Sequence, residues 1–164
     1  MQFQPKGDNQ FDGIIKHLLK TSNGDISSKV QITFSSMGSG QAINVTHYDK
    51  DDYFETNGFS RSYICFQFKG FSVVPTNYQI KSSNNGNYPK SWDIEGSNDE
   101  SNWVTLAQER GCSYLNGQNK SHVFSLYNDS SKSFSFIRMR LTDPNWKGND
   151  CLAINSFELY GSLN

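Results

Sequence analysis

Three histidines, His17, His47 and His122, are the side chains best suited to proton transfer near neutral pH. A nucleophilic enzyme also needs a serine or cysteine beside such a histidine, and an acid that orients the ring. No histidine of the chain stands in a recognisable catalytic motif, and the pattern Gly-x-Ser-x-Gly does not occur. We therefore expect no catalytic residue and no enzymatic activity.

Two acidic segments could carry other chemistry. Asp93 and Glu95 alternate with apolar residues, so they share one face of a strand, and a solvated outer face explains them better than acid–base catalysis. The run that starts at Asp49 resembles the beginning of a calcium loop, but an EF-hand needs glycine at its sixth position and glutamate at its twelfth. These positions hold Phe54 and Ser60, so we expect no EF-hand and no metal; an irregular calcium loop is the alternative.

The aromatic residues in polar segments are more informative. An aromatic face beside amide or acidic side chains can bind a sugar ring or anchor a protein partner. The alternative is that these rings close the ends of a β-sandwich, which is the interpretation we favour for Trp146. The aromatic residues concerned are Tyr48, Tyr53, Phe54, Tyr88 and Trp146.

The elements that must position these residues are mainly strands. Apolar residues at helical spacing predict one short helix over 11–20, which ends at the turn-forming run 21–25. After it the period is two, in short runs bounded by Gly, Asn, Asp, Ser or Pro. The runs lie at 30–34, 63–68, 73–80, 91–94, 103–106, 123–126, 136–141 and 156–160. This pattern predicts an all-β fold, an antiparallel jelly-roll β-sandwich of about eight strands with one short N-terminal helix.

Length and composition support one domain over 1–164. Among the 164 residues, 17 Asn and 23 Ser indicate abundant turns, and 14% aromatic residues exclude a disordered chain. A formal net charge of -1 without any Lys/Arg run argues against nucleic acid as a partner. No apolar run is long enough for a membrane span.

Neither the cysteines nor the first residues indicate secretion. The three cysteines at 65, 112 and 151 form no C-x-x-C pair, so we expect neither a disulfide framework nor a zinc site. The first eight residues lack the apolar stretch of a signal peptide. We expect a cytoplasmic protein, or a segment of a longer multidomain chain.

The segment Tyr88-Pro-Lys-Ser-Trp-Asp-Ile-Glu-Gly-Ser-Asn-Asp-Glu-Ser-Asn-Trp103 resembles the central strand–turn–strand of the F5/8 type C, or discoidin, domains. The segment 62–68 is similar to the aromatic-led core strand of that family, and 136–142 with 154–161 to its closing pair of strands. The opening 11–19 is similar to the disulfide-free variant found in intracellular multidomain proteins. The resemblance covers 11–161.

The resemblance implies a galactose-binding-like fold whose ligand lies on loops at one end, here 35–41, 47–57 and 82–88. Family ligands include galactose-type sugars, phospholipid headgroups and proteins. We predict a non-catalytic module that binds a protein partner through these loops, with no cofactor. The alternative is a lectin-like module for a galactose-type carbohydrate. A third hypothesis, which no sequence motif supports, is an enzyme that uses His47 and Asp49. The predicted ligand-binding residues are His47, Tyr48, Asp49, Asp51, Asn57, Asn84, Asn85, Asn87 and Tyr88.

Overall fold

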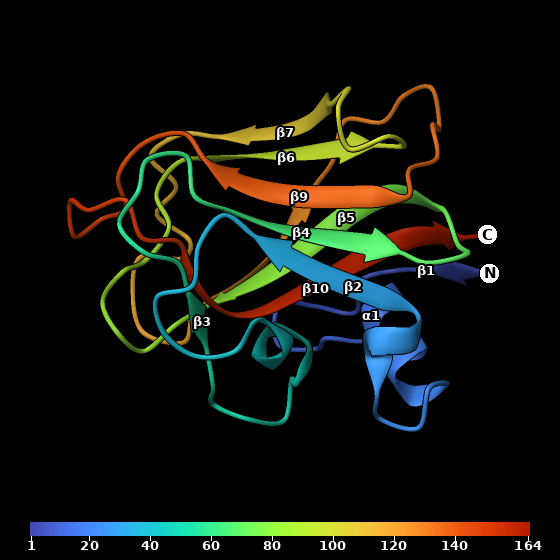
Figure 1. Cartoon of the computed structure of the whole chain (residues 1–164), viewed down its shortest axis with the longest axis horizontal. Helices are drawn as coiled ribbons and strands as arrows, with labels where there is room; N and C mark the ends of the chain where they lie inside the picture. Colours follow the sequence, from blue (N-terminus) through green and yellow to red (C-terminus); the bar gives the residue numbers. More distant parts are fainter.

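Two antiparallel sheets face each other in the computed structural model, which describes residues 1–164 (Figure 1). The first sheet has the order β1 (Gln2–Phe3), β10 (Ala153–Leu163), β5 (Val73–Ser82) and β8 (Ser121–Ser125), and β3 (Phe54–Glu55) also pairs with β10. The second has the order β2 (Val30–Phe34), β4 (Tyr63–Phe68), β9 (Phe136–Leu141), β6 (Trp92–Ser97) and β7 (Val104–Glu109). The predicted antiparallel sandwich is confirmed, with ten strands instead of about eight because the two-residue strands β1 and β3 carry no periodic signal.

Alternation along the strands builds the core, because successive side chains point to opposite faces of a sheet. In β4, Ile64 and Phe66 are fully buried, and in β9 Ile137 and Met139 are buried in the same layer. Trp92 of β6 is also fully buried, and its indole N–H donates to the Tyr78 hydroxyl at 3.1 Å. The predicted facing of these strands is confirmed.

The outward face of β6 differs from our expectation. Asp93 and Glu95 point away from the core, but their exposed fractions are only 7% and 6%. Arg138 and Arg140 both donate to Glu95, and Arg110 donates to Asp93 at 2.9 Å, so the arginine side chains cover the two carboxylates. Burial opposes ionisation of Glu95, but the hydrogen bonds from the arginines outweigh it and lower its pKa. The predicted solvated face is therefore wrong: the strand carries an ion-paired layer.

The predicted helix is present as α1 (Ile14–Lys20) and starts three residues later than the apolar stripe. Gly13 is extended at the N-cap, and the Phe11 ring instead lies tilted against the Tyr48 ring, with ring centroids 4.9 Å apart. Two short 3₁₀ helices, η1 (Ile26–Ser28) and η2 (Ala42–Thr46), complete the helical structure. No helix has the length and apolar character that crossing a bilayer would require.

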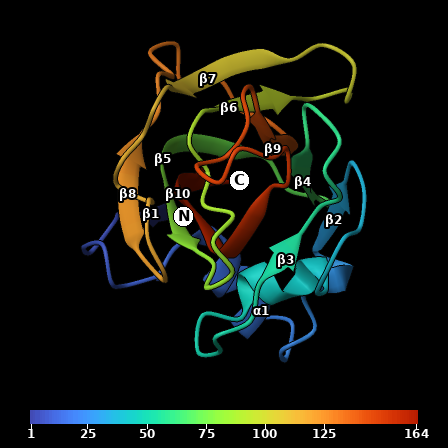
Figure 2. The ribbon, with the colours of Figure 1, turned by 90° about the vertical axis from the view of Figure 1, so that its left-hand side faces the viewer.

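The long connections gather at one end of the sandwich, on the left in Figure 1, and the two termini lie at the other end. Figure 2 looks directly onto the first end, which we call the loop end. It is formed by the segments 35–62, 83–91, 110–120 and 142–152, which connect the strands on that side.

Candidate functional site

Glu55 is the carboxylate around which the loop end is organised. The short strand β3 pairs with β10 through Phe54 and Glu55, and it buries Phe54 completely while Glu55 stays partly exposed. The Glu55 N–H donates to the carbonyl of Ser39 at 2.8 Å, and its own carbonyl accepts from Gly38 and Ser39. An added Cβ at Gly38 would lie 2.6 Å from the Thr56 carbonyl oxygen, so the glycine permits this close approach. The Gly38-Ser-Gly40 run thus serves to pack its loop against β3.

The loop 83–88 presents two amides to this carboxylate. Asn85 and Asn87 each donate a side-chain N–H to the same oxygen, Oε2 of Glu55, at 2.6 Å. The side chain of Asn85 also accepts the backbone N–H of Asn87, and Gly86 between them takes a positive φ of 89°. This turn orients both amides toward Glu55 before any ligand arrives.

The loop 142–152 extends the network, and its Asn149 stands 62 residues after Asn87. Asn149 donates to the side-chain oxygen of Asn87 at 2.9 Å and accepts from Asn145 at 2.7 Å. Asn145 is almost completely buried and also donates to the Cys151 carbonyl at 2.9 Å. Three segments distant in sequence are therefore joined by one chain of side-chain hydrogen bonds.

Trp146 holds a fixed place beside this network. Its backbone N–H donates to the Tyr88 carbonyl, and its indole N–H donates to the Cys112 carbonyl, both at 3.0 Å. The Lys90 ammonium lies over the ring, 4.8 Å from its centroid. The ring is still 37% exposed, so Trp146 does not simply close the end of the sandwich and offers part of its surface to solvent.

The structure brings some of the predicted ligand-binding residues to this network. Asn85 and Asn87 lie in it, and Tyr88 is joined to it through Trp146. Asn84 is exposed on the same turn. Asn57, two residues after Glu55, is also exposed, and its backbone N–H donates to Ser36.

Other predicted residues take part in other contacts. Asp51 accepts the Asn155 side chain at 2.9 Å, which fastens its loop to β10. Tyr48 donates its hydroxyl to the Phe157 carbonyl at 2.7 Å, and burial raises its pKa. Tyr48 and Asp49 line a separate hollow of about 550 Å³ beside α1. His47 is the C-cap residue of η2, and its backbone N–H donates to the carbonyl of Asn44.

Sequence reasoning missed several residues of the loop end. Glu55 stands in a two-residue strand without a periodic signal, and Asn145 and Asn149 lie in a loop that we had considered only for Trp146. Phe59, on the loop that follows β3, is 67% exposed and was also missed. No local pattern marks these residues, because the sequence does not show which loops meet.

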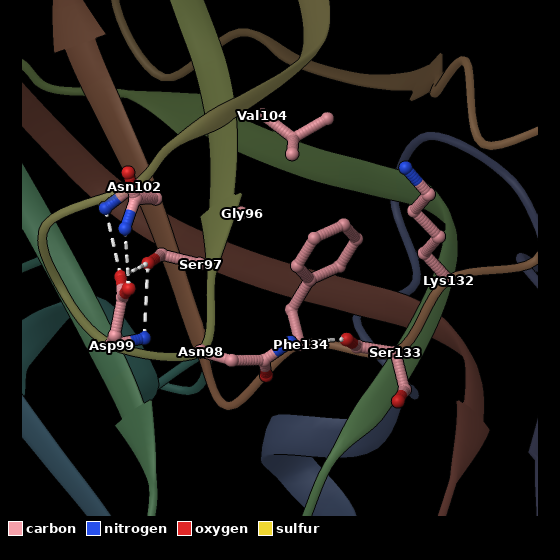
Figure 3. A pocket seen from close by; sticks show the side chains of 9 residues that line it. All are labelled: Gly96, Ser97, Asn98, Asp99, Asn102, Val104, Lys132, Ser133 and Phe134. Atoms are coloured by element: carbon pink, nitrogen blue, oxygen red, sulfur yellow. Dashed lines mark hydrogen bonds between the residues drawn. The ribbon is translucent and has the colours of Figure 1, made fainter.

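A second hollow, of about 320 Å³, lies at the opposite end of the sandwich, between the β6–β7 turn and the segment 132–134 that precedes β9 (Figure 3). Its polar groups hold the turn itself: Ser97 accepts the backbone N–H groups of Asp99 and Glu100, and Asp99 accepts those of Ser101 and Asn102. The hydrogen bonds to Asp99 lower its pKa. Because these groups are engaged within the turn, we assign the hollow to the fold.

The histidines form no nucleophilic arrangement. His122 stacks on Tyr114 with ring centroids 3.9 Å apart, and its Nδ1 lies 3.5 Å from Asp8. The His17 ring lies against the Phe3 ring, with ring centroids 5.2 Å apart. Burial raises the pKa of the Cys65 thiol to about 12, which opposes the formation of a reactive thiolate. The geometry of the loop end is suited to hydrogen bonding and ring contact.

Comparison with known proteins gives matches in structure alone. No protein-family model and no curated protein matches the sequence. The carbohydrate-binding module CBM32-3 from a family 31 glycoside hydrolase of Clostridium perfringens is similar, with a TM-score of 0.66, 13% identity, and coverage of 83% of this chain and 93% of that one.

Two further similar structures hold sugars. The CBM32 of AlyQ, in complex with 4,5-unsaturated mannuronic acid, has a TM-score of 0.63 at 15% identity and covers 80% of this chain and 95% of its own. The lectin domain of lectinolysin, in complex with Lewis B antigen, has a TM-score of 0.61 at 16% identity and covers 80% and 92%. These similarities concern the fold, and the predicted protein partner stays a prediction. The chain thus has the same β-sandwich fold as these two carbohydrate-binding modules and this lectin domain.

Proposed function

We propose that this protein is a non-catalytic module that binds carbohydrate through its loop end. The observation that carries the proposal is the chain of hydrogen bonds from Asn145 through Asn149 and Asn87 to Glu55, which lies beside the partly exposed ring of Trp146. Sugar hydroxyls need both donors and acceptors, and an aromatic face is suited to the apolar side of a sugar ring.

Preorganisation supports the proposal. Binding costs free energy when side chains must be ordered at the interface, and groups already held in place avoid that cost. Asn85 and Asn87 are fixed by Glu55 and by their own turn, and Trp146 is fixed by two hydrogen bonds. The loop end is thus a rigid polar and aromatic surface on a β-sandwich, as binding loops on rigid scaffolds commonly are.

The proposed contacts come from three segments of the loop end, 35–62, 83–91 and 142–152. Trp146 and Tyr88 supply aromatic surface, and the amides and the carboxylate supply hydrogen bonds. Asn57 and Asn84, which are exposed at the same end, extend the surface. The direct candidates are Glu55, Asn57, Asn84, Asn85, Asn87, Tyr88, Trp146 and Asn149.

We also infer that the chain is a disulfide-free F5/8 type C domain. The unpaired cysteines support this inference, because Cys65 and Cys112 are buried far from both termini in the sequence. A protein partner bound at the same loops is the alternative ligand.

A glycan array followed by calorimetric titration tests the proposal. The parent protein should bind at least one glycan, and Trp146→Ala should weaken that binding about tenfold or more, because the variant removes the ring that is fixed beside the network. Tyr127→Ala is the matched control, since this residue is 76% exposed and follows β8 at the end that carries the termini. Melting curves show whether each variant is folded. Failure of the parent to bind any glycan at millimolar concentration would overturn the proposal.

A further inference from the structure

One oxygen of Glu55 has no partner in the protein. Oε2 accepts both amides, from Asn85 and Asn87, whereas Oε1 accepts no hydrogen bond. Oε1 is not among the buried polar atoms that lack a partner, which are Oδ1 of Asn119 and Oγ1 of Thr142, so it is open to solvent. No lysine or arginine forms an ion pair with Glu55. The carboxylate is therefore anchored through one oxygen and presents the other as a free acceptor.

The carboxylates on the outer face of β6 are arranged differently. Glu95 uses both of its oxygens to accept from Arg138, with Arg140 on the first as well. Asp93 has Arg110 at 2.9 Å on one oxygen and Arg140 at 3.6 Å on the other. Cations neutralise that pair completely, whereas amides hold Glu55 and leave its charge in place.

The surroundings of Glu55 add to this negative character. Burial raises the pKa of the Cys151 thiol, and the charges of Glu55 and Asp150 raise it further, so both carboxylates act on the same position. The Lys147 ammonium lies beside Gly86, in the turn that carries the two amides, but it forms no ion pair with Glu55. An approaching anion would meet an uncompensated charge at Oε1.

We infer that Glu55 determines which class of sugar the loop end accepts. A sugar that places a hydroxyl or an ammonium group on Oε1 gains a charge-assisted hydrogen bond, which is stronger than a neutral one. A sugar that places a carboxylate or sulfate there is repelled by the negative charge of Glu55, so it binds more weakly. The module thus selects uncharged or amino sugars over acidic sugars, an inference that rests on the proposed carbohydrate binding.

The fold itself does not determine whether a module binds neutral or acidic sugars. The AlyQ module, which has the same fold, is in complex with an unsaturated mannuronic acid, an acidic sugar. Selection must therefore come from the residues that each module carries, and at the loop end of this chain Glu55 carries an open charged oxygen.

Glu55→Gln separates the anchoring role of this residue from its selective role. The carbonyl oxygen of the glutamine can accept both amides as Oε2 does, and its NH₂ group then takes the place of Oε1. The variant should keep the fold and present a donor where the parent presents an acceptor. We expect binding of uncharged or amino sugars to weaken about tenfold or more, and the preference over uronic acids to shrink or reverse.

The measurement is a glycan array that contains neutral, amino and uronic acid sugars, with calorimetric titration of the strongest binders. Glu100→Gln is the matched control, because this glutamate is exposed on the β6–β7 turn at the other end. If the parent binds uronic acids as well as neutral sugars, the inference is overturned whether or not the variant folds. Unchanged selectivity in folded Glu55→Gln also overturns it, while carbohydrate binding stands. Absence of all glycan binding removes both proposals.

Discussion

Glu158 should control both the stability of this domain and its dependence on pH. The side chain lies on β10, is completely buried, and meets the first turn of α1. One oxygen accepts the N–H groups of Ile15 and Leu159, both at 2.8 Å, and the other accepts those of Gly13 at 3.0 Å and Lys16 at 3.1 Å. A carboxylate 145 residues away from Gly13 therefore caps the helix, which has no side-chain cap of its own.

The cost of removing this carboxylate follows from the donors it would leave. In Glu158→Ala, the N–H groups of Gly13, Ile15 and Leu159 stay buried without a partner. Each unsatisfied buried donor costs about 1–3 kcal/mol, and we expect about 3–6 kcal/mol in total because the structure relaxes in part. For a domain of this size the melting temperature should then fall by roughly 6–24 °C.

The pH dependence has a definite sign. Burial raises the pKa of Glu158 to about 7 from 4.5, although the four N–H groups oppose the change. Because the folded state then holds the proton more tightly than the unfolded state, this stabilising contribution is complete below about pH 4.5 and is lost as pH rises through 7. A shift of this size corresponds to about 3 kcal/mol.

Urea denaturation of the parent and of Glu158→Gln, repeated from pH 4.5 to pH 7.5, tests both statements. The variant has no proton to lose at this position, so the difference in unfolding free energy between the two proteins should shrink by about 3 kcal/mol as pH rises. A constant difference would refute the reasoning about burial. If Glu158→Ala melts like the parent, the capping argument is wrong.

Two further substitutions test the packing. Trp92→Ala should lower the unfolding free energy by about 3–5 kcal/mol in urea denaturation, because the ring is fully buried; a midpoint like that of the parent would contradict the predicted facing of β6. Gly13→Ala should lower the melting temperature by several degrees, because its Cβ would collide with the Leu159 carbonyl oxygen and lie 2.8 Å from Cδ of Glu158. Gly58→Ala, where the nearest atom is Cys151 Sγ at 3.8 Å, is the control and should melt like the parent.

Much of the fold was predictable from the sequence because alternation is a local property. Ile137, Met139 and Leu141 face the core in the structure, as their spacing indicates. The weaker parts depend on distant contacts. The burial of Asp93 and Glu95 requires arginines from β9 and from the residue after β7, and no local pattern shows that these side chains meet.

The candidate site was predictable only in part for the same reason. Asn85 and Asn87 stand in a long polar loop, and such loops are where binding residues usually lie. Glu55 becomes notable only when the loop 83–88 folds onto β3, and Asn149 only when the loop 142–152 joins them. These partners are separated by 30 to 62 positions, so tertiary structure and not sequence spacing defines the site.

Glu55 and Glu158 show how one type of side chain serves recognition in one place and stability in another. Both are held by N–H donors and not by cations. At Glu158 both oxygens are bonded within the protein, so the group can contribute only to the fold. At Glu55 one oxygen stays open, so a ligand can complete its hydrogen bonds. Glu55→Gln should therefore alter sugar selectivity and leave the melting temperature near that of the parent, whereas Glu158→Gln should lower the melting temperature most at low pH and leave the selectivity of the folded fraction unchanged.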